Sequence, residues 1–66
     1  MKIWLNGELS DAKDAQNVAQ LAERYALRAN SVLVEHNGLA LHQREWAERK
    51  LSADDRVEFI RVVAGG

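Results

Sequence analysis

Apolar residues alternate with other side chains over residues 1–5, where Ile3 and Leu5 share one face and Lys2 and Trp4 share the other. A period of two is typical of a β-strand that buries one face. The chain is therefore expected to open with a half-buried strand.

The dipeptide Asn6-Gly7 follows this strand directly. It predicts a tight hairpin turn, because both positions tolerate the positive φ that such turns require. Residues 8–12 are then expected to return as a second strand, with Leu9 as their main apolar side chain.

The apolar spacing next becomes three and four, which predicts one amphipathic helix. Asn17 is placed as its N-cap, with Gln20 three residues later as in a capping box. We expect the helix to end between residues 27 and 30 and, being short, to depend on packing against a sheet. Its apolar face consists of Val18, Leu21, Ala22, Tyr25 and Ala26.

Three further strands are expected after the helix. Residues 32–36 and 39–41 are joined by Asn37-Gly38, a second turn of the hairpin type. Residues 42–50 are mostly polar and predict an irregular or 3₁₀ segment that Trp46 anchors to the core.

The last strand, residues 56–63, is the most apolar, with Val57 and Phe59 on the same side. We place it inside the sheet, beside the first strand. Leu51 is expected to be buried just before the turn over residues 52–55. The resulting β-β-α-β-β-β order predicts an α+β fold, in which one helix packs across one face of a mixed sheet of four to five strands.

Composition and charge exclude several classes of function. A chain of 66 residues without cysteine or proline forms one domain that depends on apolar packing and regular hydrogen bonding. Nine Lys and Arg against ten Asp and Glu give a net charge of −1, which argues against nucleic-acid binding. No apolar stretch suits a membrane span and no signal-peptide pattern occurs, so we expect a cytoplasmic protein with no membrane partner.

Candidate catalytic and metal-binding residues are few. His36 and His42 have no cysteine or suitably spaced third ligand with them. Asp54-Asp55 is more typical of a turn in which aspartates cap the backbone than of an acid–base pair. We therefore expect a protein that is not an enzyme and binds neither a metal nor a cofactor of its own.

Residues 64–66, Ala-Gly-Gly, are expected to form a flexible tail after a domain of residues 1–63. Because glycine has no Cβ, such a tail is narrow enough for Ala64 and Gly65 to insert into another protein's active site and present the Gly66 carboxylate there. Simple fraying or a cloning remnant would explain the same residues without a function.

Five segments, in this order, carry a resemblance to a known family. Asn6-Gly7-Glu8 resembles a first turn, Asn17-Val18-Ala19-Gln20-Leu21 a Thr-Val-x-Glu-Leu helix start, and Val34-Glu35-His36-Asn37-Gly38 a third strand and turn. Residues 51–57 are similar to a Leu-x-x-Gly-Asp-x-Val run, and Gly65-Gly66 completes the match. The segments resemble those of ubiquitin-like β-grasp proteins, most closely the sulfur carriers of thiamine biosynthesis, the ThiS family.

Two positions depart from the pattern of that family. His42-Gln43 stands where a Pro-Arg pair is frequent, and Asp54 stands where glycine is usual. Aspartate is among the few residues that tolerate the left-handed conformation, so we expect the turn at Asp54 to persist.

The resemblance implies a function for the tail. In this family an E1-like adenylating enzyme uses ATP, with Mg²⁺, to activate the terminal carboxylate, and a persulfide sulfur then displaces AMP to leave a thiocarboxylate. By this resemblance Gly66 is adenylated and thiocarboxylated, and its sulfur passes to thiazole synthase for the thiazole ring of thiamine. A sulfur donor enzyme is the third implied partner.

The strand pattern also predicts a docking surface for partners. Trp4, Ile60 and Val62 point away from the helix and would form one exposed apolar patch, which on a soluble protein often marks a binding site. Arg61 would pair with acidic groups of a partner. In the alternative interpretation, the 42–50 segment covers these apolar side chains.

Two other functions are compatible with the sequence. The small subunit of molybdopterin synthase resembles this fold and uses the same terminal chemistry, although its members tend to be longer. A non-reactive ubiquitin-like binding module would keep the fold, and its tail would take no part in function.

Overall fold

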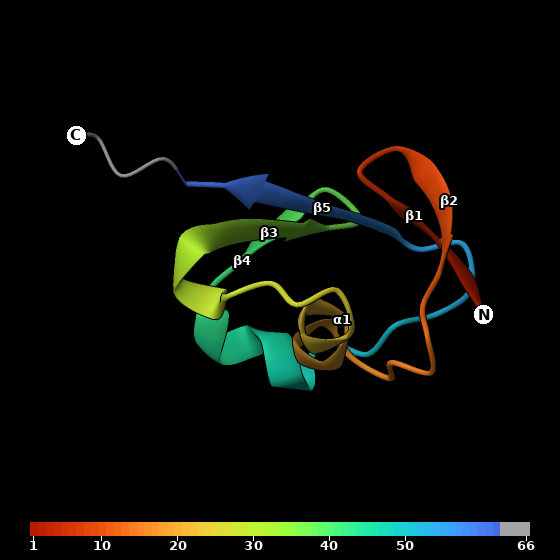
Figure 1. Cartoon of the computed structure of the whole chain (residues 1–66), viewed down its shortest axis with the longest axis horizontal. Helices are drawn as coiled ribbons and strands as arrows, with labels where there is room; N and C mark the ends of the chain where they lie inside the picture. Colours follow the sequence, from red (N-terminus) through yellow and green to blue (C-terminus); the bar gives the residue numbers. More distant parts are fainter. Residues whose placement is uncertain (63–66) are drawn as a thin grey trace.

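The computed structural model describes residues 1–62, which form one five-stranded sheet with the helical segments on one face (Figure 1). The strand order is β2-β1-β5-β3-β4, so the strand that comes last in the sequence lies at the centre. The elements are β1 (Lys2–Leu5), β2 (Glu8–Asp11), α1 (Val18–Arg24), η1 (Ala29–Ser31), β3 (Val32–His36), β4 (Leu39–Leu41), η2 (Gln43–Glu48) and β5 (Arg56–Arg61).

The sheet is mixed, as the sequence predicts. β1 and β5 are parallel, whereas β1–β2, β3–β4 and β3–β5 are antiparallel pairs. One α-helix lies across one face, which confirms the α+β prediction and the placement of the last strand beside the first.

The hydrophobic core lies between the sheet and the helical layer. Ile3 and Val57, from the two parallel strands, are fully buried against Leu21 of α1. Trp46 of η2 is also buried, with its ring edge-on to that of Phe59 and the ring centroids 6.4 Å apart. The sequence-based prediction that Trp46 anchors a 3₁₀ segment is therefore confirmed.

Three tight turns use residues that tolerate positive φ. Asn6-Gly7 has φ values of 50° and 83°, and Asn37-Gly38 has 51° and 83°, as hairpin turns require. Asp54 has a φ of 68°, so aspartate does adopt the left-handed conformation at this turn. Both predicted hairpins are confirmed.

The helix begins where the sequence predicts and ends earlier. Asn17 caps it by accepting the Gln20 N–H at 2.8 Å, while the Gln20 side chain accepts the N–H of Gln16 rather than that of Asn17. α1 ends at Arg24, and Ala26, expected on the apolar stripe, is exposed with a φ of 56°.

Backbone hydrogen bonds explain this early end. The N–H of Ala26 donates to the carbonyl of Glu23, and the N–H of Leu27 donates to the carbonyl of Ala22. This pair of bonds is a Schellman motif, which places one residue in the left-handed region, normally glycine. Alanine occupies that position here, so the sequence carries no glycine to mark the end of the helix.

The second strand differs from the prediction in one side chain. Leu9 was expected to supply the apolar contact of this strand, but it is 55% exposed because it lies opposite Trp4 on the face away from α1. The strand ends at Asp11, and Ala12 just beyond it is fully buried.

The last strand ends at Arg61, two residues earlier than predicted. Just after it, the Val62 N–H donates to the Ser31 carbonyl at 2.9 Å, which ties the end of β5 to the start of β3. The predicted strand residue Val63, the predicted boundary of the domain at residue 63 and the predicted tail over residues 64–66 lie outside the described residues.

Candidate functional site

The sheet face opposite the helical layer carries Trp4, one of the predicted docking residues, at one end. No helical segment of residues 1–62 covers this face, which we call the outer face (Figure 1). Trp4 lies on it, opposite Leu9 on β2 and opposite Arg56 on β5. The Arg56 guanidinium carbon is 5.7 Å from the centroid of the Trp4 ring, within cation–π range.

A second apolar group lies on the outer face at the other end of β5. Ile60 is opposite Leu33 of β3, and the two side chains are 44% and 59% exposed. Val62 follows at the same end and is also exposed. We call Leu33, Ile60 and Val62 the outer apolar cluster.

Trp4 and Ile60 were expected to form one continuous apolar patch, but the structure separates them. The strand register places Glu58 opposite Glu35 between them, so a row of carboxylates crosses the face where the sequence predicted apolar contact. The register of β1 against β5 explains this separation, because Trp4 is paired with Arg56 and Ile60 lies four residues further along β5.

The alternative interpretation, in which the 42–50 segment covers the outer face, is wrong. η2 lies on the same side of the sheet as α1 (Figure 1). Its Trp46 is buried in the core. The outer apolar cluster is therefore exposed.

Arg61 lies on the opposite side of the sheet from Ile60. Val57 and Phe59 are buried against the helical layer, and alternation along β5 gives Arg61 the same direction. Arg61 and Arg28 line one hollow at the end of β5. Arg28 and Leu33 were not singled out from the sequence, because only the register and the path of the chain after α1 reveal their positions.

The predicted reactive residue Gly66 and the insertion residues Gly65 and Ala64 lie outside the described residues. The described residues that precede them are those of β5, which is held on both sides. β5 pairs with β1 on one side and β3 on the other, and the bond from Val62 to Ser31 extends the second pairing by one residue.

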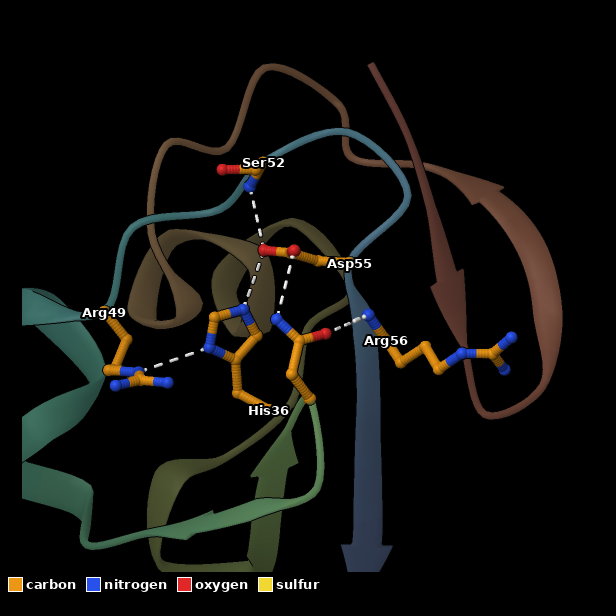
Figure 2. Close-up of polar contacts among 6 residues, drawn as sticks. His36, Arg49, Ser52, Asp55 and Arg56 are labelled. Atoms are coloured by element: carbon orange, nitrogen blue, oxygen red, sulfur yellow. Dashed lines mark hydrogen bonds and ion pairs between the residues drawn. The ribbon is translucent and has the colours of Figure 1, made fainter.

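A polar cluster holds the start of β5, at the end of the strand remote from Val62 (Figure 2). Asp55 Oδ2 accepts from His36 Nε2 at 2.8 Å and from the Ser52 N–H at 2.8 Å, and Asp55 Oδ1 accepts from the Asn37 amide at 3.1 Å. Arg49 Nε donates to His36 Nδ1 at 3.2 Å. Because Arg49 has only donors, Nδ1 must accept, and the neutral imidazole carries its proton on Nε2.

The hydrogen bonds of this polar cluster hold the 49–55 segment against His36 and Asn37. Partial burial favours a higher pKa for Asp55, but hydrogen bonds from His36, Ser52 and Asn37 outweigh it and hold the pKa below its ordinary value. Asp54-Asp55 thus forms the expected capping turn.

The two histidines that were considered and set aside as metal ligands have structural roles in the described part of the chain. His36 is buried in the polar cluster, while at the first turn of η2 the His42 N–H donates to the Glu45 carboxylate at 2.7 Å and the His42 carbonyl accepts the Glu45 N–H at 2.8 Å. Within residues 1–62, no three His, Cys, Asp or Glu side chains gather as metal ligands would. None of the described helices has the length and hydropathy needed to cross a bilayer.

Comparison with known proteins defines the class first. The family model of the ThiS family matches residues 3–66, nearly the whole chain. The chain therefore belongs to the ThiS family.

Solved structures agree with this family and its β-grasp fold. The crystal structure of the thiamine biosynthesis protein (ThiS) from Geobacter metallireducens is 30% identical, with 100% of both chains covered and a TM-score of 0.84. The solution structure of a thiamine biosynthesis protein from the same organism is 30% identical, covering 100% of this chain and 88% of that one, with a TM-score of 0.81. No curated protein matches the chain significantly.

Membership of the family bears on the predictions from sequence. It confirms the suspected resemblance and the ubiquitin-like β-grasp fold. It supports a sulfur-carrier role in thiamine biosynthesis, and with it a protein that is not itself an enzyme.

Proposed function

We propose that this protein carries sulfur for the thiazole ring of thiamine on the carboxyl group of Gly66. The observation that supports this most is the sequence Ala64-Gly65-Gly66, which follows the central strand of a ThiS-family sheet after two valines. β5 is held by both neighbours, so the domain presents its last residues from a fixed position.

The chemistry follows from the poor electrophilicity of a carboxylate. An E1-like adenylating enzyme transfers AMP from Mg²⁺-bound ATP to the Gly66 carboxylate and releases pyrophosphate. The terminal sulfur of a persulfide, formed by a sulfur donor enzyme, attacks the acyl carbon and expels AMP, which gives an acyl disulfide. A thiol then attacks the other sulfur of the acyl disulfide, the one not bonded to the acyl carbon, so that the thiocarboxylate leaves and the two remaining sulfurs form a disulfide.

In this proposal the protein itself catalyses nothing. Its folded domain is recognised first by the adenylating enzyme and then by thiazole synthase, in the cytoplasm. The exposed Ile60 and Val62 and the partly exposed Trp4 supply apolar contacts for these partners, because such side chains are common anchors of interfaces.

Reconstitution tests the proposal. The full-length chain is incubated with the adenylating enzyme of the same organism, ATP, Mg²⁺, a persulfide-forming sulfur donor and a thiol, and its intact mass is measured. We expect a fraction heavier by one exchange of oxygen for sulfur, with fragment ions that place the change on Gly66. Deletion of Gly66 should abolish the shift while leaving the unfolding curve unchanged.

Three outcomes would contradict the proposal in different ways. Persistence of the free carboxylate under these conditions favours a non-reactive binding module. A mass shift that survives deletion of Gly66 shows that the sulfur is bound elsewhere. Finally, the protein could become thiocarboxylated while deletion of its gene impairs molybdoenzymes and leaves growth independent of added thiamine. That result would assign the carrier to molybdopterin synthesis.

A further inference from the structure

A groove on the helix side of the sheet lies beside the end of β5. It measures about 300 Å³, and its lining includes Arg28, Arg61, Leu27 and Val62. We call it the arginine groove. The outer apolar cluster lies at the same end of β5 on the opposite side of the sheet.

Each arginine is presented by a fixed piece of backbone. Arg61 ends β5, and it also lines an adjoining hollow of about 360 Å³ together with Phe59 and Leu27. Arg28 precedes η1, where the N–H and hydroxyl of Ser31 both donate to the Arg28 carbonyl, at 3.0 and 2.9 Å. The two guanidinium groups are thus exposed on an ordered frame.

The groove concentrates positive charge that the described part of the chain does not neutralise. Within residues 1–62 the one ion pair between charged side chains is Arg24–Glu23, since the neutral His36 forms a hydrogen bond with Asp55, and neither contact involves Arg28 or Arg61. No carboxylate of residues 1–62 lines the groove, although acidic residues outnumber basic ones in the whole sequence. Guanidinium groups bind carboxylates with two parallel hydrogen bonds, so this surface suits an acidic polypeptide segment.

The position of Val62 argues for a protein as the occupant. Val62 borders the arginine groove and also a hollow that contains Leu33 of the outer apolar cluster. Residues 63–66 continue from this point. An enzyme that binds these residues therefore approaches the end of β5, where both surfaces lie.

We propose that carboxylate side chains of the adenylating enzyme bind the arginine groove, so that the enzyme contacts both faces of the sheet at the end of β5. This inference rests on the proposed function, because it takes the adenylating enzyme as the partner. The outer apolar cluster supplies the apolar half of the contact, and Arg28 and Arg61 supply the charged half.

Binding measurements with single charge reversals test the inference. The affinity of the full-length chain for the adenylating enzyme is measured by calorimetry at low and high salt, without ATP. We expect Arg28→Glu and Arg61→Glu each to weaken binding about tenfold at low salt and to flatten its salt dependence. Arg28→Gln should weaken binding less, since it removes the charge without reversing it.

The matched control is Lys50→Glu, which changes the net charge equally at an exposed residue bordering a different hollow. It should leave the affinity unchanged. Ile60→Ala should weaken binding at both salt concentrations alike, because the contact that it removes is apolar. Circular dichroism of each variant verifies the fold.

The results separate this inference from the proposed function. If wild type becomes thiocarboxylated while both arginine reversals bind like Lys50→Glu, the arginine groove has no such role and the carrier function stands. If wild type binds in an arginine-dependent way but is never thiocarboxylated, the inference stands and the function fails. Absence of wild-type binding overturns the inference, as does a groove that binds inorganic phosphate while its reversal leaves enzyme binding intact.

Discussion

At the scale of single residues, Asp55 is the centre of the hydrogen-bonded polar cluster at the start of β5. Its carboxylate accepts three hydrogen bonds, two from the adjacent residues His36 and Asn37 and one from the Ser52 N–H, and its side chain is only 14% exposed. Asparagine at this position would present one donor group where the carboxylate has only acceptors. We expect Asp55→Asn to lower the free energy of unfolding by about 1–3 kcal/mol, measured by urea unfolding at neutral pH.

The pH dependence of that loss has a defined sign. The pKa of Asp55 is lower in the folded protein than in the unfolded chain, so its contribution is complete above the unfolded pKa of about 3.9. It disappears as the pH falls through that value and then through the lower, folded pKa. The gap between wild type and Asp55→Asn should therefore narrow on acidification, and a gap independent of pH would contradict this account.

At the scale of elements, Asn6 joins the first hairpin to the central strand. β1 pairs with β5 as far as Leu5 and Val57, after which the chain turns away. The Asn6 side chain then accepts the Phe59 N–H at 2.8 Å and so continues the ladder by one hydrogen bond. This second role is separate from the positive φ that Asn6 supplies to the turn.

A pair of variants distinguishes the two roles of Asn6. Asn6→Gly keeps the turn conformation but leaves a partly buried N–H without its acceptor, and we expect it to cost about 1–2 kcal/mol of unfolding free energy. Asn6→Asp keeps both the acceptor and the tolerance for positive φ, so it should cost less. Equal stabilities of the two variants would show that the turn alone matters.

Sequence patterns located the elements well and the surface less well. Both hairpins, the N-cap at Asn17 and the central last strand follow from local periodicity and turn chemistry. The helix end escaped prediction because a Schellman motif formed around Ala26 without glycine. The prediction of a single apolar patch was wrong because the strand register places Glu35 and Glu58 between Trp4 and Ile60. Local sequence patterns do not determine that register.

At the scale of the whole molecule, stability depends on β5. This strand supplies Val57 and Phe59 to the core and pairs with both β1 and β3. A chain of residues 1–55 contains the sequences of both hairpins and of the helix but lacks the strand that joins them in the sheet. We expect it to be unfolded by circular dichroism and proton chemical-shift dispersion, whereas a chain of residues 1–62 should fold like the full protein.

The central place of β5 also has a consequence for synthesis in the cell. A ribosome makes β1 first and β5 after every other described element, and the sheet cannot be completed until β5 has emerged. The β1–β5 pairing joins distant parts of the chain, a connection that forms slowly in general. A nascent chain that stalls before Arg56 therefore has exposed apolar surface and depends on chaperones, so only finished molecules offer a folded domain to the modifying enzymes.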